Sequence, residues 1–216
     1  MFIAATVLAV AISAFAPPAA LQHATPVTHE QVATQAPLDR AEFHDAMRRL
    51  WEDHVTWTRL YIVSALAGLP DAEATAERLL QNQTYLGNAI KPFYGDAAGD
   101  RLTALLKPHI LIAAELVTAA KAGKSADVTS ASTRWYENAN EIADFLSAAN
   151  VKHWPQATMR AEMRHHLDLT LEEAQARLRG DWKADIAAYD KVHHHILGMA
   201  DVLSKGIVSQ FPKRFN

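Results

Sequence analysis

Cysteine is absent from the 216 residues of this chain, which excludes disulfides, Cys-x-x-Cys redox or zinc pairs and covalent haem attachment. Glycine is scarce, with eight residues. The chain contains no glycine-rich phosphate loop, no dinucleotide fingerprint and no Gly-x-Ser-x-Gly nucleophile elbow. Neither sign of charge dominates, since 21 basic and 24 acidic residues leave a formal net charge of −3. We therefore expect no electrostatic attraction to nucleic acid.

The N-terminal segment lacks charge altogether, because its first 29 residues contain no Asp, Glu, Lys or Arg. Its apolar run ends at Pro17-Pro18 and is shorter than the about 20 residues of a membrane span. We predict a signal peptide over residues 1–24 and export to the periplasm or the extracellular space. The alternative is an uncleaved anchor, which would then be the chain's contact with a membrane. Residues 25–38 are predicted to be a flexible linker, and 39–216 a single domain.

The rest of the chain is typical of helices. Half of all residues are hydrophobic, and they recur at steps of three and four. Thr170 and Glu173 have the spacing of a capping box, which predicts a helix start there. The expected helices cover 39–67, 71–90, 97–122, 127–149, 155–168 and 170–209, the last with a break near Gly180. The predicted fold class is all-α, an antiparallel bundle of about five to seven helices in which four long ones form the core.

Eleven histidines are a conspicuous number for a chain of this length. His54, His109 and His193 each fall on the apolar stripe of an expected helix, near its midpoint. Midpoints share one level in an antiparallel bundle, so we predict that these three rings converge. Asp190 lies three residues before His193 and joins the set as a ligand or as an orienting partner. Neutral imidazole and carboxylate suit a divalent metal such as zinc, iron or copper, and non-covalent haem is a further alternative.

A second set of metal ligands is predicted around His166, which shares a helical stripe with Met159 and Met163. Thioether and imidazole are a soft set that suits copper, although methionine at this spacing is also common core filler. The alternative for the buried histidines is a structural role, hydrogen-bonded to Asn138, Asp185, Tyr189 or the backbone. Asn138 would then place an amide at the midpoint of the fourth helix.

Several segments resemble a family of exported bacterial all-helical proteins to which no activity is assigned. They are Leu50–Arg59, Pro92–Gly95, Tyr189–His193 and Gln210–Pro212. The likeness extends over about residues 39–215. It implies that His54, His109, His166 and His193 are matching positions, and it implies no mechanism.

The first functional hypothesis is therefore an exported helical protein that binds a metal ion through core histidines. If catalysis occurs, water activated by the metal is the default chemistry. The competing hypothesis is a non-catalytic envelope protein that binds a partner or a small ligand and whose histidines are structural. The sequence leaves open whether the chain is an enzyme, which protein partner it has and whether it forms a homodimer.

Overall fold

The computed structural model describes residues 37–216, and the predicted signal peptide or anchor over 1–24 lies outside them, as does most of the predicted linker. The described residues form six α-helices and a short 3-10 turn at Pro212–Arg214. An isolated bridge joins Leu38 to Phe215. The predicted all-α class is confirmed. The helices are α1 (Arg40–Ala67), α2 (Ala72–Tyr94), α3 (Asp96–Lys121), α4 (Ser125–Ala149), α5 (Gln156–Leu178) and α6 (Trp182–Gln210).

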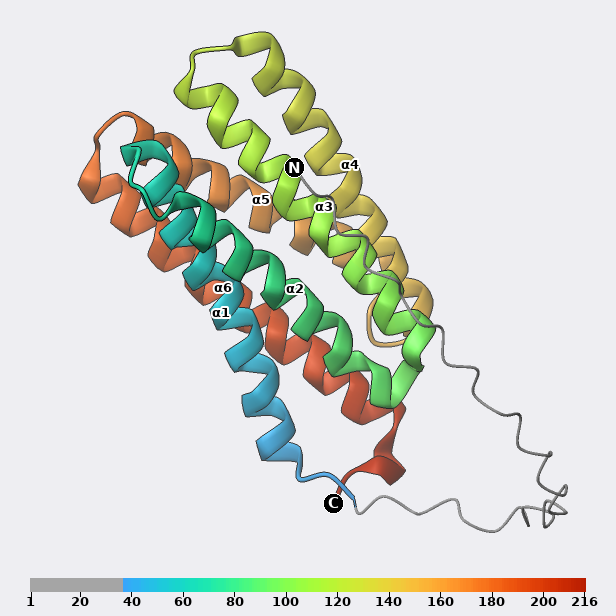
Figure 1. Ribbon diagram of the computed structural model, residues 1–216. Coiled ribbons are helices and arrows are strands. Elements are labelled where there is room, and N and C mark those ends of the chain that lie inside the picture. Colours follow the sequence, from blue (N-terminus) through green and yellow to red (C-terminus); the bar gives the residue numbers. More distant parts are fainter. Residues whose placement is uncertain (1–36) are drawn as a thin grey trace, which may run out of the picture. The chain divides into compact units, whose positions relative to one another are not determined.

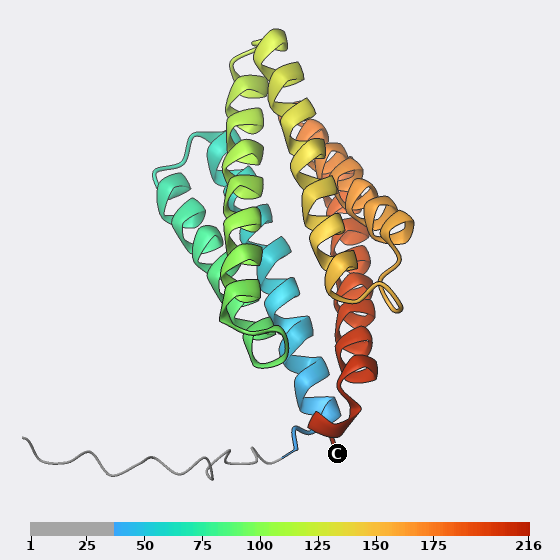
Figure 2. The same ribbon diagram turned by 90° about the vertical axis from the view of Figure 1, so that its right-hand side faces the viewer.

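Helices that are consecutive in the sequence pack against one another in space, and α6 returns to pack on α1. Successive helices alternate in direction along the long axis, so α1, α3 and α5 run the same way (Figures 1 and 2). In addition to its neighbours α2 and α6, α1 contacts both α3 and α5. The inner side of α1 therefore faces α3 and α5, the two helices that run in the same direction as α1.

Local signals set the boundaries of most helices. Asp39 caps α1, since its Oδ1 accepts from the backbone N–H of Glu42 at 2.8 Å. The helix ends at Gly68, whose φ of 70° is a left-handed conformation that favours glycine. Gly180, with φ of 72°, separates α5 from α6, and the carboxylate of Asp181 accepts from the N–H of Ala184 at 3.1 Å.

The predicted helix start at Thr170 is wrong, because α5 runs without a break from Gln156 to Leu178. Within that helix the Thr170 hydroxyl donates to the carbonyl oxygen of His166 at 2.8 Å, an intrahelical bond that competes with capping. Glu173 is 1% exposed and lies in the interior. The capping-box spacing thus lies in the middle of a helix, where both side chains have other partners.

The α3 helix is long and apolar enough to cross a membrane by length and composition, with a mean hydropathy of 1.4 over its most apolar window. In the structure it packs between α2 and α4. Its contact with α2 is close, because a Cβ added at Gly87 would lie 2.5 Å from the carbonyl oxygen of Gly99. The apolar character of α3 thus serves helix packing within the domain.

Candidate functional site

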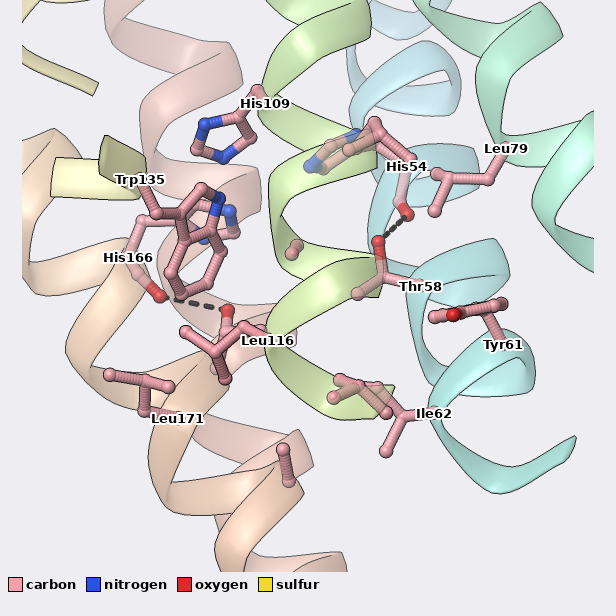
Figure 3. A pocket seen from close by; sticks show the side chains of 15 residues that line it. His54, Thr58, Tyr61, Ile62, Leu79, His109, Leu116, Trp135, His166 and Leu171 are labelled. Atoms are coloured by element: carbon pink, nitrogen blue, oxygen red, sulfur yellow. Dashed lines mark hydrogen bonds between the residues drawn. The ribbon is translucent and has the colours of Figure 1, made fainter. Parts of the chain in front are cut away.

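Three histidines lie together inside the domain, one on each of the helices that run in the same direction. They are His54 on α1, His109 on α3 and His166 on α5, and each is only 3–4% exposed. The ring centroid of His166 lies 5.7 Å from that of His54 and 6.5 Å from that of His109. Figure 3 shows the three rings together, above the apolar side chains of Leu116 and Leu171.

Helix length explains why the three rings share a level. Each histidine lies close to the middle of its helix, and the helices are similar in length, at 28, 26 and 23 residues. The structure thus brings together His54 and His109, as their midpoint positions predict. The third ring is that of His166, which the sequence placed in a separate set with Met159 and Met163.

His193 does not join this group. Its side chain is 34% exposed and its Nε2 lies 3.1 Å from the Glu52 carboxylate. The inward face of α6 at this level is occupied by the buried side chains of Val192 and Ile196, and consecutive helical residues point about 100° apart. Asp190 is exposed and lines a surface groove. The structure therefore does not bring His193 and Asp190 together with His54 and His109, as the sequence had predicted.

The ring of His109 is oriented by an amide on α4. Its Nδ1 lies 2.9 Å from Oδ1 of Asn138, and Nδ2 of Asn138 donates to the carbonyl oxygen of Leu105 at 3.1 Å. This second bond fixes the amide, so Nδ1 of His109 carries the proton and donates. The Nε2 atom then keeps its lone pair. Metal-binding histidines are commonly held in this way by a partner on the second nitrogen.

The ring of His54 has an amide partner on α2. Nε2 of Gln83 lies 3.3 Å from Nδ1 of His54 and also donates to the carbonyl oxygen of Leu79 at 2.8 Å. Nδ1 of His54 therefore accepts, and the ring proton is on Nε2. A ligand on Nε2 would move that proton to Nδ1. The Gln83 amide would then have to turn over, so that Oε1, which is buried without a partner, accepts in place of the bond from Nε2 to Leu79.

Unpaired polar atoms are concentrated around these rings. Among the described residues, five buried side-chain nitrogen or oxygen atoms have no hydrogen-bond partner, and four of them lie here. Each costs about 1–3 kcal/mol when it is left unpaired, so their grouping is more typical of a ligand or water site than of a structural core. The four are Nδ1 of His166, Oε1 of Gln83 and Nε1 of Trp51 and Trp135.

A cavity of about 40 Å³ separates the rings from the apolar side chains beyond them. A buried water needs roughly 10–15 Å³ of such space, so two or three waters, or an ion with a water, fit there. An adjoining apolar cavity of about 120 Å³ shares the walls formed by Leu116 and Leu171. Organic ligands usually occupy about 300–1,000 Å³, so the space favours an ion over haem.

Burial keeps all three rings neutral. It lowers the pKa of His54 to about 3, with a further contribution from His109, and it lowers the pKa of His109 to about 4 against the opposing hydrogen bond from Asn138. The pKa of His166 is lowered by burial and then by the neighbouring rings of His54 and His109. Neutral imidazole is the form that binds metal ions, so each ring has a lone pair at neutral pH, although that of His54 accepts from Gln83.

The rings are slightly too far apart to share one ion as they stand. Two imidazoles whose nitrogens each lie about 2 Å from a metal have centroids roughly 5 Å apart, whereas the observed distances are 5.7 and 6.5 Å. Within residues 37–216, no group of three or more His, Asp or Glu side chains is already arranged around a metal position. Binding would require the rings to draw together.

A second buried polar cluster joins α1, α5 and α6, and sequence reasoning did not find it. Nη2 of Arg59 donates to Oδ2 of Asp185 at 2.8 Å, and Nη1 of Arg59 contacts both Oδ1 of Asp185 and Oε1 of Glu173, the latter at 2.9 Å. Arg177 donates to Oδ2 of Asp185 at 3.1 Å. The signal available in the sequence was the position of two acidic residues, Glu173 and Asp185, on the inward-facing stripes of their helices, since a buried carboxylate needs a partner.

Charge and burial act against each other in this second cluster. Burial raises the pKa of Glu173 to about 7, and the hydrogen bond from Arg59 opposes that rise. Asp185 is buried too, but hydrogen bonds from Arg59 and Arg177 leave its pKa below the usual value. At neutral pH the cluster therefore holds an ionised Asp185 between the guanidinium groups of Arg59 and Arg177. Glu173 is close to half protonated at that pH, because its pKa is about 7.

Comparison of the chain with protein-family models, with curated proteins and with solved structures found no match. The resemblance to exported bacterial helical proteins therefore stays a prediction. A function for this protein has to be inferred from its own residues and their contacts.

Proposed function

We propose that the protein binds one transition-metal ion through His54, His109 and His166. The observation that carries the proposal is the meeting of three neutral imidazoles from three helices at a cavity whose lining includes His166 and Trp135, the residues of two of the unpaired nitrogens. Imidazole donors suit Zn²⁺, Cu²⁺ or Fe²⁺. His166 replaces His193 and Asp190 of the sequence hypothesis, because those two side chains lie on the surface.

The proposal treats the six helices as one antiparallel bundle. Two of the four long helices that were predicted to form its core, α1 and α3, would supply ligands. The α4 helix would supply Asn138 as the partner that orients His109. The third ligand would come from α5, which the sequence divided at residue 169.

Ion binding is a better fit to the cavity than hydrolysis. Three protein ligands leave a position for water, whose pKa a bound metal lowers. The side chains that line this cavity include no carboxylate that could serve as a base. The hydroxyls of Thr58 and Thr170 also line the cavity, but they already donate to the backbone carbonyl oxygens of His54 and His166 (Figure 3). If residues 1–24 direct export, binding would take place outside the cytoplasm.

A second candidate function is the binding of a small apolar molecule. The adjoining cavity of about 120 Å³ favours it, since its walls are mostly aliphatic and end at Leu66 and Leu178. In that case the histidines would be structural, and metal ions would leave the stability of the protein unchanged.

The decisive experiment uses protein purified without a histidine tag and loaded with Zn²⁺, Cu²⁺ or Co²⁺. We expect one ion per chain in the cavity, cobalt absorption bands of nitrogen coordination, and a stabilisation of about 2.7 kcal/mol at a hundredfold excess over the Kd. For a chain of this size that corresponds to a rise in Tm of roughly 5–10 °C.

The variants separate the structural assignment from the sequence hypothesis. His109→Leu and His166→Leu should lose the cavity ion and the rise in Tm, while His193→Gln should keep both. Loss of the ion in His193→Gln but not in His166→Leu would contradict the proposed ligand set. An unchanged Tm with every metal would favour the apolar ligand instead.

A further inference from the structure

A second group of imidazoles lies at the surface beside the cavity. His165 on α5 is exposed, and its ring centroid is 4.8 Å from that of His195 on α6, with the ring planes at 81°. The side chain of His195 is 11% exposed. The carboxylate of Glu162 lies beside them, three residues before His165 and on the same face of α5. His165 and His195 both line a surface groove.

Two electron-pair donors for a metal face each other in this group. Nε2 of His195 lies 3.2 Å from the backbone carbonyl oxygen of Glu162. Because a carbonyl can only accept, Nε2 carries the ring proton. Nδ1 of the neutral ring then has a lone pair, and it lies 3.7 Å from Oε2 of Glu162. Ligand atoms bound to one metal ion at about 2.0–2.2 Å are separated by a similar distance.

The surface group is connected to the cavity through successive rings. The centroid of His195 lies 6.2 Å from that of His166, and the two ring planes are within 18° of parallel. His166 in turn lies 5.7 Å from His54. Imidazoles thus succeed one another from the exposed His165 to the buried end of the cavity, at steps of 4.8–6.5 Å.

We propose that Glu162, His165 and His195 form an outer site for a divalent cation such as Cu²⁺ or Zn²⁺, from which the ion passes to the cavity through His166. Two imidazoles and one carboxylate are a donor set for such ions. The outer site rests on the contacts of His195 with His165 and with Glu162, and the three side chains would have to draw together around an ion. The passage of the ion rests on the proposed function of the cavity.

The outer site is tested alone in the His109→Leu protein, where the cavity set is broken. We expect one Cu²⁺ per chain, with nitrogen coupling in the electron paramagnetic resonance spectrum. Adding Glu162→Gln or His165→Gln should weaken that binding at least about tenfold. His153→Gln, in the link between α4 and α5, is the matched control. Circular dichroism verifies folding, and His54→Gln is a second background if His109→Leu does not fold.

The passage is tested by stopped-flow loading of the otherwise unchanged protein with Co²⁺. Glu162→Gln and His165→Gln should slow filling of the cavity about tenfold or more and leave its final occupancy unchanged. Unaltered Cu²⁺ binding in the double variants overturns the outer site. Unaltered loading rates overturn the passage. If the outer site binds Cu²⁺ but the cavity never fills, the proposed function and the passage are both overturned. The outer site is then supported on its own.

Discussion

Two buried polar clusters share the helices α1 and α5 of this protein and are completed in different ways. The ion cluster is made by Arg59, Glu173, Arg177 and Asp185, and both carboxylate oxygens of Asp185 accept from guanidinium groups. The imidazole cluster is made by His54, His109 and His166. There the protein leaves Nδ1 of His166 and three neighbouring polar atoms without partners.

The difference fits a structural role for the ion cluster and the proposed binding role for the imidazole cluster. A buried charge is tolerated when it is paired and costs several kcal/mol when its partner is removed. A buried neutral group without a partner lowers stability and is retained where a ligand completes it. The two clusters should therefore respond in opposite ways to the same kind of substitution.

The largest expected effect is acid destabilisation through the imidazole cluster. The pKa values of His54 and His109 are about 3 and 4 in the folded protein and near 6.5 in the unfolded chain. The unfolded state therefore binds more protons below pH 6.5, and the free energy of unfolding falls as the pH falls from 6.5 towards 4. Each ring contributes on the order of 1 kcal/mol per pH unit.

Urea unfolding at pH 6.5 and pH 4.5 measures this loss, which we expect to reach several kcal/mol. The exposed His194 is the control, because His194→Gln should leave the pH dependence as it is, whereas His54→Gln should reduce it. Equal stability at the two pH values would show that the buried rings do not carry the effect.

Asp185→Ala is expected to have the next largest effect, through the ion cluster. It leaves Arg59 and Arg177 without the carboxylate that both contact, and breaking a buried ion pair costs about 3–5 kcal/mol. Chemical denaturation at pH 7 measures the loss. Asp190→Ala, at an exposed position of the same helix, should change stability by less than about 0.5 kcal/mol. Similar losses in the two variants would mean that the cluster is not a unit.

Glu173→Gln sharpens the comparison within the ion cluster. The pKa of Glu173 is raised to about 7 by burial, above its unfolded value, so this group contributes stability at low pH that is lost as the pH rises from about 4.5 to 7. Glutamine mimics the protonated form. The variant should therefore match the wild type below about pH 4.5 and exceed it by about 3 kcal/mol at pH 8. Parallel stability curves over this range would contradict the assignment.

The smallest expected effect is that of His166→Leu without metal. It removes an unpaired buried nitrogen, so the free energy of unfolding at pH 7 should stay within about 1 kcal/mol of the wild type or rise. Asn138→Leu is the contrasting variant, because it leaves Nδ1–H of His109 without its acceptor and should cost about 1–3 kcal/mol. A large loss in His166→Leu would place that ring among the structural residues.

Much of the fold could be predicted from local patterns. Asp39 and Asp181 cap helices, Gly68 and Gly180 end them, and the apolar stripes place His54 and His109 on inward faces. The failure at Thr170 and Glu173 has the same origin, since a capping-box spacing is compatible with a helix interior when both side chains find other partners.

The candidate site was only half predictable. The level of each histidine along the long axis is set by its position in its helix. This position was sufficient to predict that His54 and His109 lie at the same level. The angle about the helix axis decides which ring faces inward, and on α6 the packing of Val192 and Ile196 turns His193 outward. His166 was assigned to another set because the division of α5 hid its place at a helix midpoint.

By itself the sequence determined the helical class, most of the helix ends and the level at which polar side chains lie, because caps, glycines and periodicity act within a few residues. Only the tertiary structure decided which rings meet and which charges pair. Those contacts join side chains far apart in the sequence, such as Arg59 with Asp185, and depend on how each helix is rotated against its neighbours.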